Sequence, residues 1–493
     1  MDLPHRPAAL FDREGEWRDL ASFVADPAAG LRIGVVYGRR RMGKSFLLEA
    51  LADATGGLYH QALEDERTPA LARLGASIAS ARGLSGMAIA LSDWPTALRA
   101  LAETSTSQAG RLVVLDEFPY LLARAPELAS AVQELYDASR RRPGAPVRLV
   151  LCGSAISVMS RLLSGQQALR GRVTTELVVG PFDFRAAAAF WGVAADPRLA
   201  FLLYAVLGGT PGYRDLLGAG PGSEGDFGAW LAEGILNPSQ ALFREPDFVL
   251  AEEPAITDRA IYQSTLAAIA GGRRTSGAIA ATLGRPETSM THILDGLERA
   301  GFIERADDVL RARRPTLRIL DPLLRFHHAV VRPDARRFEA RRTADAWGDA
   351  AARFATGVIG PSFEEIARAW TWTHASEATL GGRPTHVGST VIADPAGRAQ
   401  LAIDVVAVDR TTPGAGGPRV LLLGEAKAST TARGVGDLRR LERARDLLRG
   451  RADVGGARLA IVGLGGFDRE LRAEDKGRPD VVLVDLDRLY HGS

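Results

Sequence analysis

Short apolar runs rich in β-branched residues alternate with amphipathic stretches over the first half of the chain. We expect strands at 32–37, 57–63, 112–115, 148–152 and 174–179, with helical patterns between them. This alternation is typical of a parallel sheet covered by helices. A helix-rich segment follows from 185 to 217, and a glycine-rich break comes at 218–225. The pattern predicts an α/β domain with a helical lid over residues 1–235.

A second block, 252–330, has three short helical patterns and then a β-like stretch. The last of the helices carries apolar residues at i, i+3, i+4 and i+7, namely Met290, Ile293, Leu294 and Leu297. That spacing buries one stripe and leaves Thr288, Thr291 and His292 outward, like the reading face of a helix-turn-helix. A hairpin-like segment from 301 onward then brings Arg311, Arg313, Arg314 and Arg318. We therefore expect a winged helix-turn-helix.

The outward face of that helix also carries two acids, Asp295 and Glu298, which repel phosphate. Contact with DNA and contact with a protein therefore both stay open for this block. His292, like His327 and His328, has no metal-type partner pattern and is expected to be a surface or packing residue.

The third block, 335–493, opens with helical patterns and continues with two strong strand runs. The runs lie at 399–408 and 419–424, and a turn-forming loop at 411–418 joins them. A helix rich in arginine and leucine follows, and two further apolar runs lie at 459–462 and 481–484. This pattern predicts a small third α/β domain.

Composition fits a chain of 493 residues in about three soluble domains, because 46% of the residues are hydrophobic and 24% are charged. The formal net charge of +2 neither requires nor excludes nucleic acid, and the arginine-rich stretches 332–342 and 433–451 are expected to be solvated helix faces. The single cysteine, Cys152, excludes an internal disulfide, and no run of about 18–20 apolar residues is present. We expect a cytoplasmic protein that does not contact a membrane.

One motif carries specific chemistry for phosphate. The sequence Gly38, Arg39, Arg40, Arg41, Met42, Gly43, Lys44, Ser45 fits the P-loop pattern G-x-x-x-x-G-K-[ST], directly after one predicted strand and before a helical segment. Glycines let backbone N–H groups wrap phosphates at a helix N-terminus, where the helix dipole favours anions. Lys44 is expected to reach the β- and γ-phosphates of ATP, and Ser45 to ligate Mg²⁺.

Two later strand ends supply the other parts of such a site. The apolar run at 112–115 ends in Asp116 and Glu117. Asp116 is expected to hold the Mg²⁺ of ATP, and Glu117 to polarise the attacking water. The run at 148–152 leads to Ser154, which is a candidate contact for the γ-phosphate or the water if its strand lies beside the P-loop strand.

These motifs together resemble the archaeal-type ATPase family, on the AAA+/STAND side of the P-loop NTPases. The resemblance extends through 169–172, 181–182 and 208–213. It implies that Arg172 is a sensor or finger arginine acting on the γ-phosphate and that Pro211, in the lid, lies near the base. It also implies that Arg13 and Glu14 belong to an N-terminal segment that closes over the adenine.

A second constellation lies in the third block. Asp404 and the later Glu425 and Lys427 fit the D…(D/E)-x-K arrangement of the restriction-endonuclease-like (PD-(D/E)xK) fold, in which two acids on adjacent strands hold Mg²⁺ and the lysine orients hydroxide. Upstream, Ser362 and Glu365 have the spacing of a helical capping box, and Glu364 would offer a third acid to the metal. Family relatives resemble this block, although residues 387–390 depart from their tryptophan-containing pattern.

The expected fold is therefore a P-loop NTPase three-layer sandwich with a helical lid, then a winged helix, then a small restriction-endonuclease-like domain. The first function hypothesis is an ATPase that couples Mg²⁺·ATP binding and hydrolysis to modules acting on nucleic acid, with DNA favoured over RNA, and with metal-dependent cleavage left open. The alternative is an ATP-dependent scaffold for a protein partner or further copies of the chain, with an inactive nuclease-like domain. A metabolic kinase is disfavoured because the acid pair at 116–117 suits water activation.

Overall fold

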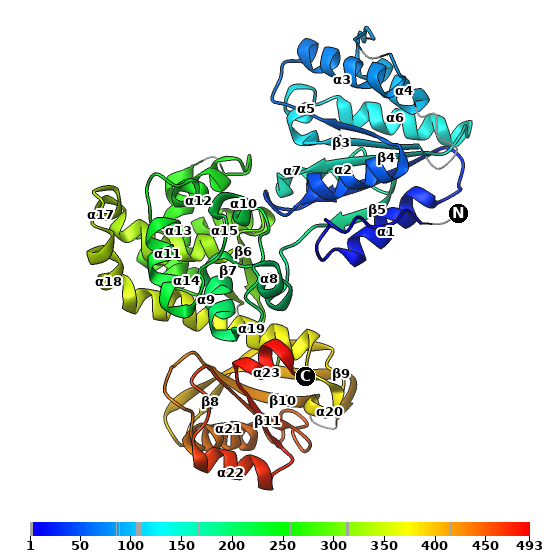
Figure 1. The fold of residues 1–493 in the computed structure, drawn as a ribbon. Helices are drawn as coiled ribbons and strands as arrows, with labels where there is room; N and C mark the ends of the chain where they lie inside the picture. The colour runs from blue at the N-terminus through cyan, green and yellow to red at the C-terminus, as the bar shows by residue number, and fades with distance from the viewer. Residues whose placement is uncertain are drawn as a thin grey trace.

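The structure, a computed structural model, describes residues 3–84, 86–87, 89–104, 111–165, 167–256, 258–311, 315–414 and 417–493. Five parallel strands form the first sheet, in the order β2-β3-β4-β1-β5 (Figure 1). They are β1 (Leu31–Tyr37), β2 (Leu58–Gln61), β3 (Arg111–Asp116), β4 (Val147–Gly153) and β5 (Val173–Val178). All five predicted strands are present, and β4 is buried along its whole length, because helices cover both faces of the sheet.

Two hydrophobic cores hold these helices to the sheet. One face is covered by α1 (Glu14–Ala25) and α2 (Lys44–Thr55). The other is covered by α3 (Arg67–Ala81), α4 (Trp94–Thr104), α5 (Phe118–Arg124) and α6 (Leu128–Arg141), with α7 (Ile156–Leu162) at its end. This three-layer arrangement is the α/β fold of a P-loop NTPase.

Helices continue the chain after the sheet. They are α8 (Phe184–Phe190), α9 (Pro197–Leu207), α10 (Tyr213–Leu217), α11 (Phe227–Glu233) and α12 (Ala241–Ala251). Asp183 and Asp196 cap α8 and α9 by accepting hydrogen bonds from backbone amides of the first turn, which fixes where each helix begins.

The middle block contains three helices and a hairpin. They are α13 (Arg259–Ala270), α14 (Ser276–Thr282), α15 (Glu287–Arg299), and the antiparallel pair β6 (Ile303–Ala306) and β7 (Thr316–Ile319), followed by the short α16 (Pro322–Phe326). The apolar stripe predicted for α15 is buried, and its three outward residues are exposed. Asp295 and Glu298 both pair with Arg305 of β6, so their charges are compensated. Arg313 and Arg314 lie outside the described residues.

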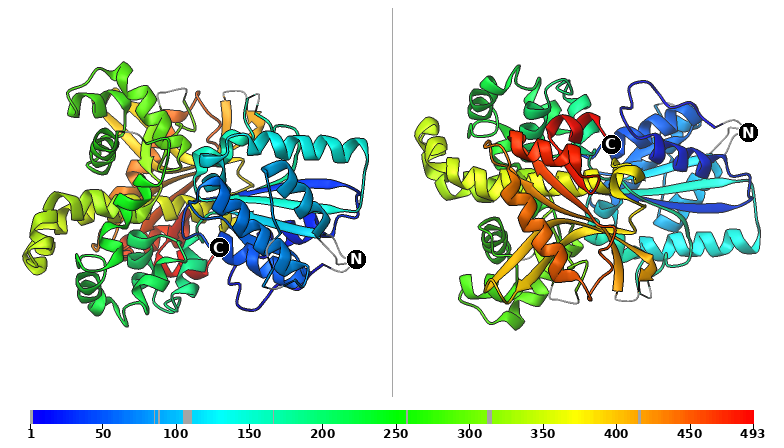
Figure 2. Two further views of the ribbon diagram at one scale, coloured as in Figure 1. Left: turned by 90° about the horizontal axis from the view of Figure 1, so that it is seen from above. Right: turned by 90° about the horizontal axis from the view of Figure 1, so that it is seen from below.

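The last block builds a second, mixed sheet in the order β12-β11-β10-β9-β8. Its strands are β8 (His386–Asp394), β9 (Ala399–Gly414), β10 (Gly417–Lys427), β11 (Arg458–Gly463) and β12 (Val481–Val484). Its helices are α17 (Ala335–Glu339), α18 (Thr343–Phe354), α19 (Gly360–Thr373), α20 (Glu377–Leu380), α21 (Val435–Leu448), α22 (Arg469–Gly477) and α23 (Leu486–His491). Strands β8, β9 and β10 are antiparallel, whereas β10, β11 and β12 are parallel. Helices α17 and α18 project on the side away from the N-terminus (Figure 2).

The predicted capping box at Ser362 is wrong. Helix α19 begins at Gly360, directly after a π-helical turn at Ala355–Ile359 that continues α18, so no helix starts at Ser362. Ser362 is buried and accepts a hydrogen bond from Arg325, and Glu365 pairs with the same arginine. These two side chains serve a contact between segments of the chain and not a helix end.

A single core joins segments that are far apart in the sequence. Helix α9 packs against α16, α19 and α23, and α19 covers one face of β9 and β10. The lid helices therefore share their hydrophobic core with the second sheet, while the P-loop sheet lies at the other end of the molecule (Figure 1). Within the ranges described, none of the helices has the length and apolar character needed to cross a bilayer.

Candidate functional site: the nucleotide site and a cluster of carboxylates

The P-loop follows β1 and ends in α2, as its motif predicts. Gly38 cannot be replaced without movement, because a Cβ there would lie 2.2 Å from the carbonyl oxygen of Val179. Gly43 caps α2 with a φ of 82°, in the left-handed region that favours glycine. Lys44 is buried, and its Nζ donates a hydrogen bond of 2.9 Å to the carbonyl oxygen of Arg39. Burial lowers the pKa of Lys44, although the nearby acids oppose this shift.

Ser45 and Asp116 meet at the carboxyl ends of β1 and β3. The Ser45 hydroxyl lies close enough to the Asp116 carboxylate to lower its pKa, and the Tyr59 hydroxyl donates to Asp116 Oδ2 at 2.6 Å. Asp116 is fully buried, and burial favours its neutral form; the hydrogen bonds that it accepts outweigh burial and lower its pKa. The two predicted Mg²⁺ ligands are thus adjacent, and the carboxylate is held ionised.

Glu117 lies beside Asp116 in a left-handed backbone conformation, with a φ of 51°. Burial and the neighbouring Asp116 charge raise its pKa. Ser154 donates to Glu117 Oε2 at 3.0 Å, and β4, the strand before Ser154, pairs with β1 as the sequence suggested. In this structure Ser154 holds the acid that the sequence assigns to water activation. A carboxylate with a raised pKa beside the phosphate loop suits a general base.

The three arginines inside the P-loop each pair with an acid from later in the chain. Arg41 pairs with Glu245 of α12, and Arg40 pairs with Glu252 at the end of that helix. Arg39 Nη1 lies 2.9 Å from Asp321 Oδ2, and its guanidinium also lies over the ring of Phe302. Nothing in the spacing of the sequence indicated these partners. They tie the P-loop to the lid and to the middle block.

The lid and the N-terminal segment also contact the P-loop. The amide of Gly212 donates to the carbonyl oxygen of Arg41 at 3.1 Å, and Pro211 lies beside Gly43. Arg13 donates to the carbonyl oxygens of Met42 and Gly180 and lies over the ring of Phe182. Pro211 and Arg13 are therefore next to the P-loop, whereas Glu14 pairs with Arg6.

A contact between Arg172 and the γ-phosphate of its own chain is not possible in this geometry. Arg172 precedes β5, whose first residue, Val173, pairs with Ile33 at the start of β1. The P-loop follows the carboxyl end of β1. Arg172 therefore lies at the other end of the strands, where β1 and β5 begin. There it forms a two-pronged ion pair with Asp137, at 3.1 and 3.0 Å.

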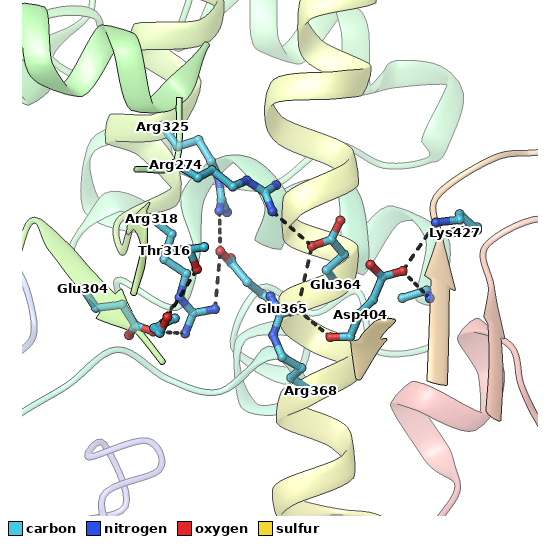
Figure 3. A network of polar contacts seen from close by, with 12 residues as sticks. Arg274, Glu304, Thr316, Arg318, Arg325, Glu364, Glu365, Arg368, Asp404 and Lys427 are labelled. Carbon is cyan, nitrogen blue, oxygen red and sulfur yellow. Dashed lines mark hydrogen bonds and ion pairs between the residues drawn. The ribbon is translucent and has the colours of Figure 1, made fainter. Parts of the chain in front are cut away.

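The predicted acids of the third block come together as well. Lys427 Nζ lies 3.0 Å from Glu425 Oε1 and 3.4 Å from Asp404 Oδ2 (Figure 3 shows the Asp404 contact). Arg440 Nε lies 3.1 Å from Glu425 Oε2, a buried oxygen that makes no hydrogen bond in the structure. Burial opposes the charge of Lys427, but Asp404 and Glu425 outweigh this effect and raise its pKa.

Glu364 approaches the same cluster from α19 (Figure 3). Burial and the Asp404 charge raise the pKa of Glu364, and Arg274 and Arg368 lie 3.9 and 3.7 Å from its carboxylate. Arg368 also donates to the backbone carbonyl of Asp404 at 2.9 Å. Among the residues described, no three acid, histidine or cysteine side chains are grouped as metal ligands. Lys427 and Arg440 pair with the carboxylates of the cluster.

Only three of the 61 basic residues are lysines, and two of them are Lys44 and Lys427. Lys44 and Lys427 thus place a compact ammonium group at each of the two sites. Tyr59, Arg274 and Arg440 were not predicted, because each reaches its partner from an element whose position only the fold defines.

Comparison with known proteins supports the nucleotide site. Residues 31–187 match the protein family described as an AAA domain. An uncharacterized protein of Methanocaldococcus jannaschii is 26% identical over 304 residues, 61% of this chain and 64% of that protein, so the match spans less than two thirds of the relative.

One of two similar solved structures supports the same fold. A Walker-type ATPase of Pyrococcus abyssi is 21% identical with a TM-score of 0.51, over 66% of this chain and 98% of that one. The ORC2 protein of Aeropyrum pernix, solved with ADPNP and ADP, is 16% identical with a TM-score of 0.44, over 69% and 97% of the two chains. The family match and the site geometry together support an AAA-type P-loop ATPase domain that includes residues 31–187.

Proposed function

We propose that this chain is an ATPase in which Mg²⁺·ATP binding and hydrolysis change the state of a C-terminal module that acts on nucleic acid, with DNA favoured. One observation carries the proposal: polar contacts at the two ends of helix α16 and along helix α19 connect the P-loop with the carboxylate cluster. They give nucleotide binding a physical route to the second sheet.

The series passes through the short helix α16. Arg39, whose carbonyl accepts from Lys44, pairs through its side chain with Asp321, and Asp321 caps α16 by accepting from the amide of Leu324. Four residues after Asp321, Arg325 donates to Glu365 Oε1 at 2.7 Å and to Ser362 Oγ at 2.9 Å, both on α19.

Helix α19 then connects Arg325 with the acids of the carboxylate cluster. Glu365 faces Arg325, while the adjacent Glu364 faces Arg274, Arg368 and the Asp404 side of the cluster (Figure 3). A displacement of α16 by a change in the P-loop would therefore move α19 relative to β9. Helices α16 and α19 both pack against α9 in one shared core, which favours discrete alternative arrangements over gradual deformation.

Mg²⁺ fits the nucleotide site. Ser45 and Asp116 offer a hydroxyl and an ionised carboxylate side by side, the donors that this cation prefers. Bound with ATP, the ion would neutralise phosphate charge. Lys44 would contact the phosphates, and Glu117, held by Ser154, would accept the proton of the attacking water. Arg172, which pairs with Asp137 here, would act on a γ-phosphate only in a second copy of the chain, so this role requires an oligomer.

The remaining parts support a division into an ATPase with lid at 1–235, a winged helix at 252–330 and a restriction-endonuclease-like domain at 335–493. Three helices followed by a hairpin form the middle block, with arginine on the hairpin strand β7. In the third block, Asp404 and Glu425 lie on the paired strands β9 and β10, and Glu364 lies on the helix that covers them.

A divalent cation fits the third block in part. The buried Glu425 Oε2 accepts no hydrogen bond, although Arg440 Nε lies 3.1 Å away, and Asp404 and Glu364 are near. Lys427 and Arg440 now occupy the space around these oxygens, so a cation would have to displace them. The metal would activate a water molecule there, and side chains of the cluster would orient that water.

Coupling is tested by measuring the affinity of a fluorescent DNA probe with ATP analogue, with ADP and without nucleotide. We expect the nucleotide to change DNA affinity in the wild type, and Arg325→Ala to remove that change while both ligands still bind. Arg305→Ala, which breaks an ion pair within the middle block away from α16, is the matched control. Equal coupling in wild type and Arg325→Ala would rule out the α16 route.

The pairing of Glu425 with two basic side chains also favours a second function. If Lys427 and Arg440 are permanent partners of Glu425, the third block binds without cleaving, and the chain is an ATP-dependent scaffold for a protein partner. Such a protein would change its assembly state with nucleotide in the absence of DNA, which light scattering of the purified chain measures.

A further inference from the structure

A large cavity lies where the three parts of the molecule meet. Its volume is about 1510 Å³, and residues of the P-loop, the hairpin β6–β7, helix α16, helix α19 and strand β8 all line it. Arg39 of the P-loop lies on one part of its wall, and Glu364 of the carboxylate cluster lies on another. The cavity therefore lies between the P-loop and Glu364, the member of the carboxylate cluster that reaches it.

Helix α19 presents three different side chains to this cavity. Glu364, Arg368 and Trp372 follow one another at intervals of four residues, so they lie along one face of the helix, and all three line the cavity. Trp372 is 57% exposed, although large apolar side chains on other faces of α19, such as Phe363 and Trp370, are fully buried. An indole left open on a cavity wall is available to a ligand.

Cationic side chains reach the same cavity from two other elements. Arg274, between α13 and α14, is half exposed, and its nearest carboxylate, Glu364, is 3.9 Å away. Arg410 of β9 is exposed and donates to the backbone carbonyl of Val309. Guanidinium groups recognise phosphate by paired hydrogen bonds, and a free indole face stacks on a nucleobase.

We infer that this cavity binds a single strand of nucleic acid, with Trp372 stacking on one unpaired base and Arg274, Arg368 and Arg410 contacting the backbone. The inference rests on the proposed function and names its ligand. An unpaired strand is required because a base inside a duplex is already stacked on both sides and cannot present its face to Trp372. Glu364 on the same helix face marks where the cavity reaches the carboxylate cluster.

The test compares a fluorescein-labelled single strand of mixed sequence with its duplex, by fluorescence anisotropy on the full chain. We expect Trp372→Ala to weaken single-strand binding about 10- to 100-fold, as loss of one stacked base does elsewhere. Trp372→Phe retains a stacking face and should keep most of the affinity. Phe248→Ala removes a comparably exposed aromatic side chain outside the cavity and should leave affinity unchanged.

A second measurement locates the strand directly. A single strand carrying 5-iodouracil should crosslink on irradiation to the peptide between Arg368 and Arg383, identified by mass spectrometry, and excess unlabelled single strand should suppress the crosslink. Tight duplex binding that is indifferent to Trp372→Ala would overturn this inference and leave the proposed action on nucleic acid standing. Failure of the wild type to bind either form would overturn both.

Discussion

Arg41 and Glu245 form a two-pronged ion pair between the P-loop and helix α12, with N–O distances of 2.6 and 2.9 Å. The side chain of Glu245 is only 4% exposed. The preceding residue of the P-loop, Arg40, pairs with Glu252 seven residues further on, but there both partners are more than 40% exposed. The two pairs join the same two segments and differ mainly in burial.

This difference predicts unequal costs of removing each arginine. Arg41→Ala leaves a carboxylate buried without its cation and should lower the free energy of unfolding by about 3–5 kcal/mol. Arg40→Ala removes a solvent-screened pair and should cost about 0–1 kcal/mol. Urea denaturation of both variants beside the wild type measures the difference. Equal losses would show that burial of Glu245 does not decide the strength of the contact.

The raised pKa of Glu117 predicts the acid limb of the ATPase pH profile. A general base acts only when deprotonated, and burial and Asp116 raise the pKa of Glu117 above its ordinary value of 4.5. Activity should therefore be lost, as pH falls, at a higher pH than for an ordinary glutamate. Ser154→Ala removes a hydrogen bond that favours the charged form, so it should move the limb to still higher pH.

The measurement is kcat against pH for wild type, Ser154→Ala and Glu117→Gln. The last variant should bind ATP and lose hydrolysis at every pH. A Ser154→Ala limb at lower pH than that of the wild type would contradict the assignment of Glu117 as the base.

Lys44 should be required for nucleotide binding. It is buried beside the P-loop carbonyls, so Lys44→Ala removes the cation that would contact the phosphates. We expect at least about a 100-fold loss of affinity for a fluorescent ATP analogue, by the tenfold per 1.4 kcal/mol relation for a charge-assisted contact of about 3 kcal/mol. Lys476→Ala, at an exposed lysine of α22, is the control. Retained binding in Lys44→Ala would place the phosphates elsewhere.

Cleavage decides between the two proposed functions. Purified protein is incubated with linear, supercoiled and single-stranded DNA and with RNA, in Mg²⁺ or Mn²⁺, with and without ATP. If the third block is a nuclease, Glu425→Ala and Lys427→Ala should each abolish cleavage, while Glu470→Ala, at an exposed acid of α22, should retain it. Absence of cleavage with intact ATPase activity would favour the scaffold.

The pattern of the chain alone predicted the strands of the first sheet, the P-loop, the acids after β3 and the buried stripe of α15. These features depend on residues within about ten positions of one another, where hydrophobic period and motif spacing express local backbone geometry directly. Glu364 was also expected near Asp404 and Glu425, at the start of an upstream helix; the structure puts it inside α19, where the Asp404 charge acts on it.

Tertiary structure alone decided which charges meet. Ser362 and Glu365 have the spacing of a helix start, yet Arg325, nearly forty residues earlier, takes both as partners. Arg172 belongs to a family-like motif, yet the direction of β5 puts it where the strands of the sheet begin, away from the P-loop. An ion pair depends on the distance between two side chains in space, and that distance is set by the packing of α12, α16 and α19 and not by separation along the chain.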